Sequence, residues 1–216
     1  MRNHFDEQLA LLNTELIEMG MLCEESLSFT LKALVNKDIE TAKKVKPLSY
    51  KIDRKERDIE NICLKLLLQQ QPVAKDLRII STALKIITDM ERIGDQAEDI
   101  ADIITVMNTD STYSCPEIID MANATIKMLT QSVDAYVKQD INLAETVIKN
   151  DDIVDNYFVK IKNILINHIA TDSESGEFTL DLLMISKYFE RIGDHSTNIA
   201  EWVIFSITGQ HNKEIN

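Results

Sequence analysis

Apolar residues recur at alternating steps of four and three through residues 79–104, the spacing of one buried stripe along a helix. The pattern returns at 178–203, where seven of the eight stripe positions are apolar and the eighth is the small Ser196. Both stretches are therefore predicted to be long helices that turn this stripe toward a bundle core. The first stripe consists of Ile79, Ala83, Ile86, Met90, Ile93, Ala97, Ile100 and Ile104. The second consists of Phe178, Leu182, Ile185, Phe189, Ile192, Ser196, Ile199 and Val203.

Similar apolar spacing predicts helices over nearly the whole chain. In the first half the expected helices cover 4–35, 38–70 with a bend near Pro47, and 73–107. In the second half they cover 117–137, 140–170 and 178–208. Turn-forming residues fill 108–116, the expected linker, and 171–177, the expected last turn. The predicted fold class is all-α, with two tandem three-helix bundles at residues 1–108 and 109–216.

An internal duplication supports this division. The five residues ERIGD occur at 91–95 and again at 190–194, an offset of 99. The segment 33–53 also aligns with 135–155, at an offset of 102. The second copy is therefore three residues shorter between its second and third helices. Gly94 and Gly193 lie inside these helices, where glycine is unfavourable, so we expect either a close helix approach or backbone clearance beside the acids.

Composition and charge narrow the possible functions. The chain has 216 residues, only five glycines and three prolines, too few turn formers for an all-β protein. Its net charge of −13 would repel phosphate backbones, so no nucleic acid partner is expected. The three cysteines form neither a zinc motif nor a disulfide framework. The N-terminus is unlike a signal peptide, and no segment approaches the about 18 apolar residues of a membrane span, so we expect a cytoplasmic protein.

Acidic residues lie off the apolar stripes, at corresponding places in both halves. Each residue turns a helix by about 100°, so two carboxylates spaced i, i+4 share one face and repel each other. Either these are solvated faces, with Arg92 and Arg191 as neutralising partners, or they hold a cation that suits carboxylate ligands. The acids concerned are Asp53 with Glu56 and Glu60, Glu91 with Asp95, Asp151 with Asp155, and Glu190 with Asp194.

Catalytic motifs are lacking in the sequence. It contains no phosphate-binding loop, dinucleotide fingerprint or nucleophile elbow. No histidine follows a glutamate by three residues, which argues against a ferritin-like di-iron centre. We expect His195 to be a surface residue and His168 to be a satisfied core residue. The sequence therefore does not indicate an enzyme, although a two-metal hydrolase or a metal-binding structural bundle stays an alternative.

With these motifs, the chain resembles the PhoU family, the phosphate-specific transport system accessory proteins. The resemblance is carried by ERIGDQAEDIAD at 91–102 and ERIGDHSTNIAE at 190–201. QQPVAKDLR at 70–78 is similar to the family's turn between its second and third helices. KNDDIVD at 149–155 is similar to its second-helix motif. Together these segments extend the resemblance over essentially the whole chain.

The resemblance implies a non-enzymatic adaptor of two pseudo-symmetric bundles, as a homodimer. Such an adaptor would repress the phosphate regulon and limit phosphate uptake when phosphate is abundant. Its implied partners are the ATPase of the phosphate ABC transporter and a phosphate-sensing histidine kinase.

The resemblance also implies bound metal ions, which could be iron, zinc, manganese, magnesium or calcium. Transferred to this chain, the metal motifs are Glu91 with Asp95, Asp151 with Asp155, and Glu190 with Asp194. The fourth motif departs from the family pattern, because Ser49 precedes Asp53 where an acid is expected. Glu56 shares that face and could compensate. The first-half site is therefore expected to be the weaker of the two.

Overall fold

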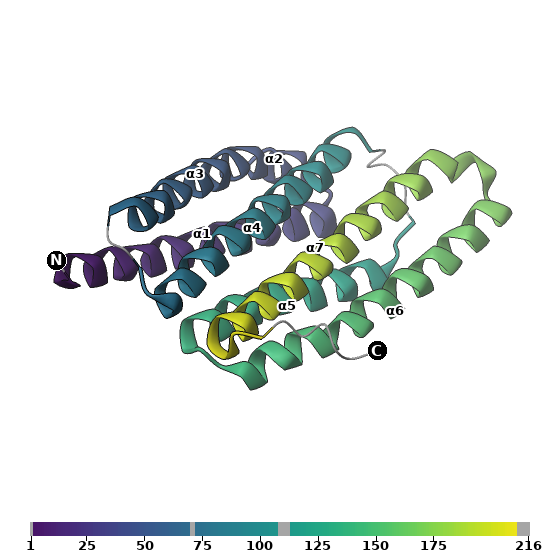
Figure 1. The fold of residues 1–216 in the computed structure, drawn as a ribbon. Coiled ribbons are helices and arrows are strands. Elements are labelled where there is room, and N and C mark those ends of the chain that lie inside the picture. Colours follow the sequence, from purple (N-terminus) through teal and green to yellow (C-terminus); the bar gives the residue numbers. More distant parts are fainter. Residues whose placement is uncertain (1, 70–71, 108–112, 211–216) are drawn as a thin grey trace.

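The computed structural model describes residues 2–69, 72–107 and 113–210, and within these ranges the chain is helical with no strand. The first bundle contains α1 (Arg2–Asn36), the short α2 (Ile39–Ala42), α3 (Val45–Gln69) and α4 (Ala74–Val106). The second contains α5 (Pro116–Lys138), α6 (Ile141–Thr171), the 3₁₀ turn η1 (Ser173–Ser175) and α7 (Gly176–Thr208). Figure 1 shows the two bundles side by side. The all-α, twin-bundle prediction is confirmed, while the predicted boundary at 108/109 lies outside the described residues.

The predicted helix over 38–70 is divided in two. It starts at Asp38, whose carboxylate accepts hydrogen bonds from the backbone N–H groups of Glu40 and Thr41. It ends after one turn, and α3 begins at Val45, so that Pro47 lies in the first turn of α3. A proline there needs no intrahelical donor, whereas in a continuous helix its ring would clash with the carbonyl four residues earlier. The proline therefore sets a helix boundary rather than a bend.

The two halves share turn geometry as well as sequence. Lys37 and its counterpart Gln139 both adopt the left-handed conformation, with φ of 52° and 51°. Each is followed by an aspartate that caps the next helix, Asp38 in the first half and Asp140 in the second. The duplication is thus a repeat of structure down to single backbone angles.

The predicted stripes form the core. All eight stripe residues of α7 are buried, and in α4 every one is buried except Ile79. These residues pack with buried apolar residues of α1, α3, α5 and α6 in one cluster that extends through both bundles. The exception at Ile79 has a cause, because this residue lines a cavity between the bundles.

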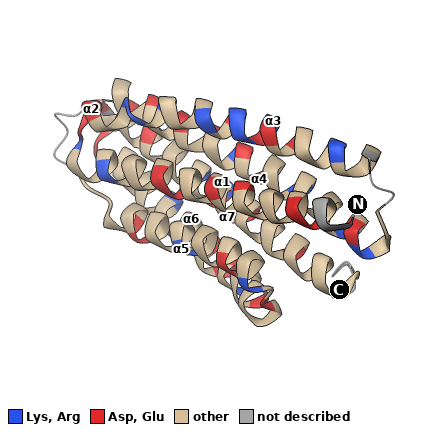
Figure 2. Ribbon diagram, turned by 90° about the vertical axis from the view of Figure 1, so that its left-hand side faces the viewer, with Lys and Arg blue, Asp and Glu red and all other residues tan. Residues whose placement is uncertain are grey.

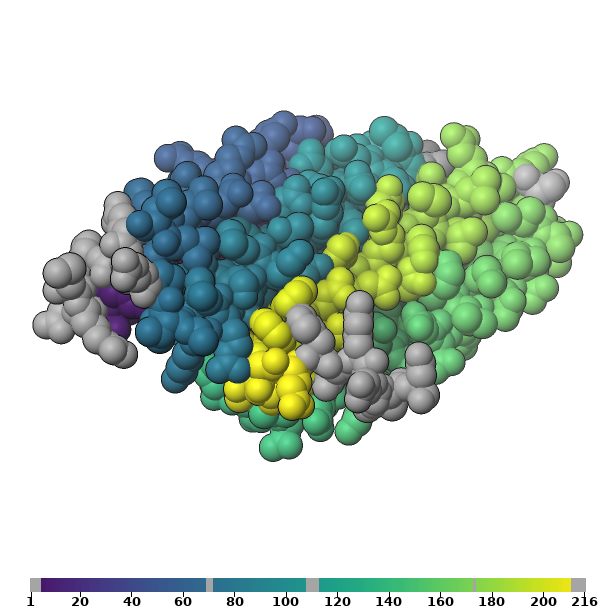
Figure 3. All heavy atoms as spheres, viewed as in Figure 1, coloured from purple at the N-terminus to yellow at the C-terminus, as the bar shows by residue number. Residues whose placement is uncertain are grey.

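The bundles meet along α4 and α7, which run antiparallel (Figure 1) and lie against each other across the middle of the face shown in Figure 3. One oxygen of Asp89 on α4 accepts hydrogen bonds from His195 at 2.8 Å and Asn198 at 3.1 Å on α7. Burial and the nearby charge of Asp99 on α4 raise the pKa of Tyr188 on α7. Adding 99 to Asp99 gives Asn198, and adding 99 to Asp89 gives Tyr188. The pairs Asp89–Asn198 and Asp99–Tyr188 are therefore related by the pseudo-twofold axis.

The two ERIGD glycines allow close helix packing. A β-carbon placed on Gly94 would lie 3.0 Å from Cδ1 of Ile52 on α3, which is closer than a normal van der Waals contact. On Gly193 it would lie 3.3 Å from Cγ1 of Val154 and 3.5 Å from Oδ1 of Asp151, both on α6. Close approach and clearance beside an acid, the two predicted reasons, thus both apply at Gly193.

Among the described residues, no helix combines the length and apolar character that crossing a membrane requires.

Replacing Gly94 by alanine is expected to destabilise the first bundle. Alanine gains about 1 kcal/mol in helix propensity, but forcing a methyl group into a packed core typically costs about 1–3 kcal/mol. Ile52 is fully buried and has little room to move. We expect a net loss of about 1 kcal/mol in the free energy of unfolding, measured by urea denaturation. Gly176→Ala is the control, because nothing lies within 4 Å of its added carbon. An equal effect of both substitutions would contradict the packing role of Gly94.

Candidate metal centre

Three carboxylates converge in the groove between α3 and α4. Asp53 projects from α3, and Glu91 and Asp95 project from successive turns of α4. One oxygen from each of the three lies within 4.8 Å of the other two. All three residues are partly buried. We call Asp53, Glu91 and Asp95 the first acidic cluster; no other trio of His, Cys, Asp or Glu meets this distance in the described part of the chain.

The first acidic cluster holds more negative charge than its surroundings compensate. Partial burial and the charge of Asp95 raise the pKa of Glu91 above its ordinary value. Partial burial and the charge of Asp53 raise the pKa of Asp95. Both shifts show that ionising the carboxyl groups costs free energy, which a bound cation would lower.

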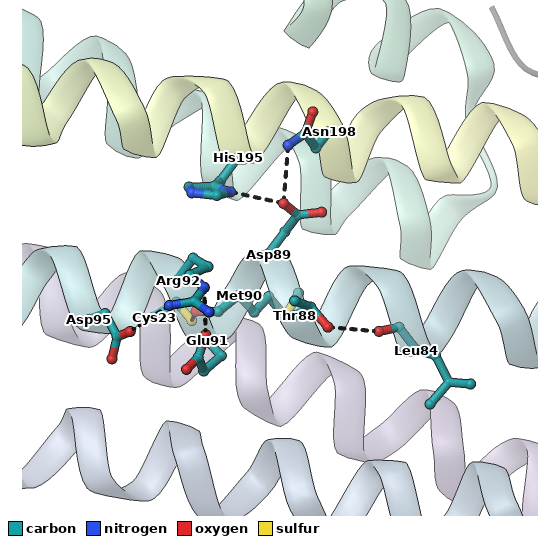
Figure 4. A network of polar contacts seen from close by, with 10 residues as sticks. All are labelled: Cys23, Leu84, Thr88, Asp89, Met90, Glu91, Arg92, Asp95, His195 and Asn198. Carbon is teal, nitrogen blue, oxygen red and sulfur yellow. Dashed lines mark hydrogen bonds and ion pairs between the residues drawn. The ribbon is translucent and has the colours of Figure 1, made fainter.

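Arg92 offsets part of this charge. Its Nε lies 3.3 Å from Oε2 of Glu91, and its Nη1 lies 3.5 Å from Oδ2 of Asp95. Figure 4 shows the guanidinium group between the two carboxylates. The Arg92 side chain is 56% exposed, so these pairs are of the solvent-screened kind that adds little stability. Arg92 therefore forms the exposed ion pairs that the sequence left open as an alternative to a bound cation.

The residues of the first acidic cluster fit a hard or borderline cation. Carboxylate oxygens are the ligands that such ions prefer, and three of them leave coordination positions for water. Asp53 carries no acidic partner at Ser49, which is buried in the helix packing. The Ser49 departure nevertheless leaves the cluster intact, because Asp53 meets both acids of α4. Glu56 is close enough for its charge to raise the pKa of Glu91, but it does not belong to the trio.

The four acids of the second bundle do not converge as tightly. Asp151 and Asp155 lie on α6 and Glu190 and Asp194 on α7, and we call them the second acidic cluster. No three of them meet the distance that joins the first cluster. The Lys187 ammonium group forms an ion pair with Glu190 from one turn earlier in α7. The expectation that the first half holds the weaker site thus finds no support in this geometry.

Asp151 is the most perturbed of these acids. Its Oδ1 is buried and makes no hydrogen bond of normal geometry, although the nearby Thr197 hydroxyl slightly lowers its pKa. Burial, with the charges of Asp194 and Asp155, raises the pKa of Asp151 to about 6. The pKa of Asp194 is also raised, by partial burial and the charge of Glu190, although this residue remains exposed. An unsatisfied carboxylate oxygen among other acids is a feature that a cation would relieve.

The predicted acids thus occupy two separate grooves. Figure 2 shows acidic positions along the ribbons of α3 and α4. The eight metal ligands proposed from the sequence are Asp53, Glu56, Glu91, Asp95, Asp151, Asp155, Glu190 and Asp194. Metal binding by this set stays a prediction.

Both histidines differ in surroundings from what the sequence suggested. His195 was expected at the surface, but its side chain is only 19% exposed and bonds Asp89 across the bundle interface (Figure 4). His168 is partly buried rather than in the core, and it is satisfied as predicted. Its ring stacks on Tyr113 at 3.7 Å, and its Nε2 hydrogen-bonds Ser175 at 3.0 Å. The spacing around His195 did not indicate its partner Asp89, which lies on another helix.

Fold and site together define a class: a duplicated all-helical protein with carboxylate clusters in the two grooves of its pseudo-symmetric bundles. A model of the PhoU domain matches residues 16–104 and again 118–203. A phosphate-specific transport system accessory protein PhoU homolog from Clostridium acetobutylicum is 38% identical over 97% of this chain and 96% of its own length. PhoU homolog 1 from Thermotoga maritima is 33% identical over 98% of this chain and 92% of its own length.

Solved structures agree with the sequence comparisons. The crystal structure of PhoU from Pseudomonas aeruginosa superposes with a TM-score of 0.92 at 30% identity, covering 95% of this chain and all of the other. PhoU from Streptococcus pneumoniae gives 0.89 at 26% identity, covering 96% and 98%. The chain belongs to the PhoU family, and the resemblance found in its sequence is confirmed.

The raised pKa of Asp151 predicts a pH-dependent stability. A carboxyl whose folded pKa exceeds its unfolded value binds its proton more tightly when folded, so stability rises as pH falls through about 6 toward 4. In metal-free protein, Asp151→Asn is expected to reduce this dependence and to raise the free energy of unfolding at pH 7 by about 1 kcal/mol. Urea denaturation at pH 5 and pH 7 with a chelator measures both effects. Asp120→Asn, at an exposed acid outside both clusters, is the control; a pH slope as steep in Asp151→Asn as in the wild type would disprove the assignment.

Proposed function

We propose that this protein regulates phosphate uptake as an accessory protein of a phosphate-specific transport system. The observation that carries this proposal is the match of both repeats to the PhoU domain, together with relatives of that name along nearly the full chain. A fragment or a single shared bundle would support the fold alone. Here the domain model matches both halves, and the relatives align over 97% and 98% of the chain.

Within that role, the protein acts as an adaptor in the cytoplasm. It represses the phosphate regulon when phosphate is plentiful, and it links the transporter's ATPase to a phosphate-sensing histidine kinase. Its own contribution is binding rather than turnover, in keeping with a sequence that has no catalytic motif. A homodimer is the proposed assembly.

The proposal includes metal ions bound at the surface of the folded adaptor. Asp53, Glu91 and Asp95 would hold one ion in the first groove, where their oxygens already lie close together. Asp151 and its neighbours would hold another ion in the second groove, in competition with the Lys187 ammonium group for Glu190. A cation would supply positive charge to both acidic grooves.

The regulatory role is testable with a phosphate-responsive reporter in cells that lack this protein, grown in abundant phosphate. We expect loss of the protein to switch the reporter on and the wild type to silence it. A variant with Glu91, Asp95, Glu190 and Asp194 all replaced by alanine is expected to silence it only partly, because its grooves no longer attract cations. Reporter output is compared at equal protein levels, measured by immunoblot.

A charge-matched control separates the clusters from net charge. Replacing four exposed acids outside both clusters, Glu25, Asp58, Asp120 and Glu145, by alanine changes net charge equally and is expected to leave silencing intact. A reporter that ignores loss of the protein would refute the regulatory role. Equal failure of both variants would refute the part assigned to the acidic grooves.

The two clusters are expected to differ in metal affinity. In protein stripped by a chelator, Asp53→Asn with Asp95→Asn should remove the tighter Mn²⁺ site, because these residues supply two of the three converged carboxylates. Asp151→Asn with Asp194→Asn should remove a weaker site, because Lys187 already pairs with Glu190 there. Isothermal titration with Mn²⁺ resolves the sites. A larger loss of Mn²⁺ affinity in the Asp151→Asn, Asp194→Asn variant would reverse this ranking. Wild-type titration curves in both double variants would refute metal binding by these clusters.

A further inference from the structure

A cavity of about 300 Å³ opens between the bundles, away from both acidic clusters. It is lined from four helices: Ile17 of α1, Ile79 and Thr82 of α4, Tyr136 of α5 and Ser206 of α7 are among its walls. Its volume is at the lower end of the range of about 300–1,000 Å³ that small-molecule pockets occupy. Such a space accommodates a one- or two-ring compound.

The repeat contains a second cavity that serves as an internal comparison. It lies at the opposite end of the bundle interface and measures about 180 Å³. At the position of Ile79 it has Phe178, and at the position of Ser206 it has Met107, both larger. At the position of Gln139 it has Lys37, whose ammonium group lies 5.7 Å from the centre of the Phe178 ring. Of these two equivalent spaces, one is therefore smaller and lined by a lysine, whereas the other is larger and has no lysine in its described lining.

Thr82, one of the residues that line the larger cavity, has a hydroxyl group without a hydrogen-bond partner. Thr82 is completely buried, and its Oγ1 has no hydrogen-bond partner. The buried helical threonines Thr30 and Thr125, by contrast, each donate to the carbonyl four residues earlier. An unsatisfied buried hydroxyl costs about 1–3 kcal/mol, so a ligand that pairs with it recovers that free energy on binding.

Further polar groups are fixed at the rim. The Tyr136 hydroxyl donates to Oδ1 of Asn13 at 2.6 Å, a hydrogen bond between the two bundles. Gln139 donates from Nε2 to the Tyr136 carbonyl at 2.8 Å, which orients its amide group. Amides and hydroxyls both donate and accept hydrogen bonds. The walls thus combine apolar surface with a set of donors and acceptors of mixed kind.

Among the described residues, none of those that line this cavity is charged at neutral pH. Its polar side chains are Asn13, Thr82, Tyr136, Gln139 and Ser206, and burial raises the pKa of Tyr136, so the phenol stays neutral. An ion would lose its hydration here without gaining a counter-charge. The net charge of −13 further disfavours an anion such as a nucleotide phosphate.

We propose that this cavity is a binding site for a neutral cyclic amide, the chemical class of the free nucleobases. The ring lies against Ile17, Ile79 and Val137, and its amide edge pairs with Thr82 and with the Asn13–Tyr136 hydrogen bond. Because the ligand contacts α1, α4, α5 and α7 at once, its binding energy acts directly on the contact between the bundles. The site is independent of the acidic clusters and of the proposed role in phosphate uptake.

Titration of ¹⁵N-labelled protein with uracil and with hypoxanthine tests this site. We expect saturable amide shifts at Thr82, Tyr136 and Gln139 with at least one probe at about 1 mM. Orotate, which is uracil carrying a carboxylate, is the matched charged probe and is expected to give no such shifts. Absence of saturable shifts with both neutral probes, or equally tight binding of orotate, would overturn the proposal.

Two variants decide where the probe binds. Ile79→Phe introduces the residue of the smaller cavity and is expected to abolish binding, whereas Ile119→Phe fills that smaller cavity and should leave binding unchanged. Thr82→Val keeps the shape, removes the unpaired hydroxyl and should weaken binding roughly threefold to tenfold. Circular dichroism shows whether each variant is folded. If Ile79→Phe does not fold, the affinity of Thr82→Val alone tests the site. A folded Ile79→Phe variant that binds the probe as tightly as the wild type would refute this binding site. If only Thr82→Val folds, unchanged affinity in that variant would refute it.

Discussion

The antiparallel packing of α4 against α7 is the contact on which the rest of this structure depends. Each helix supplies the buried stripe of its own bundle and, on another side, part of the interface between bundles, to which α1 and α5 also contribute. The hydrogen bonds of Asp89 with His195 and Asn198 fix the relative position of the two helices along that interface. Because two sides of each helix are used for packing, the acids of ERIGD face the outer grooves.

This arrangement explains why the acids are both gathered and perturbed. The glycine between the acids in each ERIGD brings the second helix of the bundle close, and with it Asp53 or Asp151. Close packing partly removes carboxylates from water while placing them beside each other, and both effects raise the pKa. The unfavourable charge is thus a direct consequence of tight helix contact, and a cation is the simplest means of relieving it.

The two halves have diverged around a common frame. The backbone repeat is kept to matching left-handed residues, yet the first groove brings three carboxylates together while the second has a lysine paired with Glu190. The cavities diverge too, with Ile79 in one and Phe178 in the other. Duplication therefore supplied paired sites, and substitution at single positions gave each member of a pair its own chemistry.

The sequence by itself determined the helices, the duplication, the core stripes and the acidic faces, because these follow from periodicity along one chain. It predicted a bend at Pro47 where a helix starts, because the exact helix boundary does not follow from periodicity. It predicted His195 at the surface, because its burial depends on a neighbouring helix. Only the tertiary structure decided that Asp53 completes a trio despite Ser49, and that Thr82 is buried unpaired beside a cavity. Spacing along a helix defines a face, but distances between helices depend on the side chains that separate them.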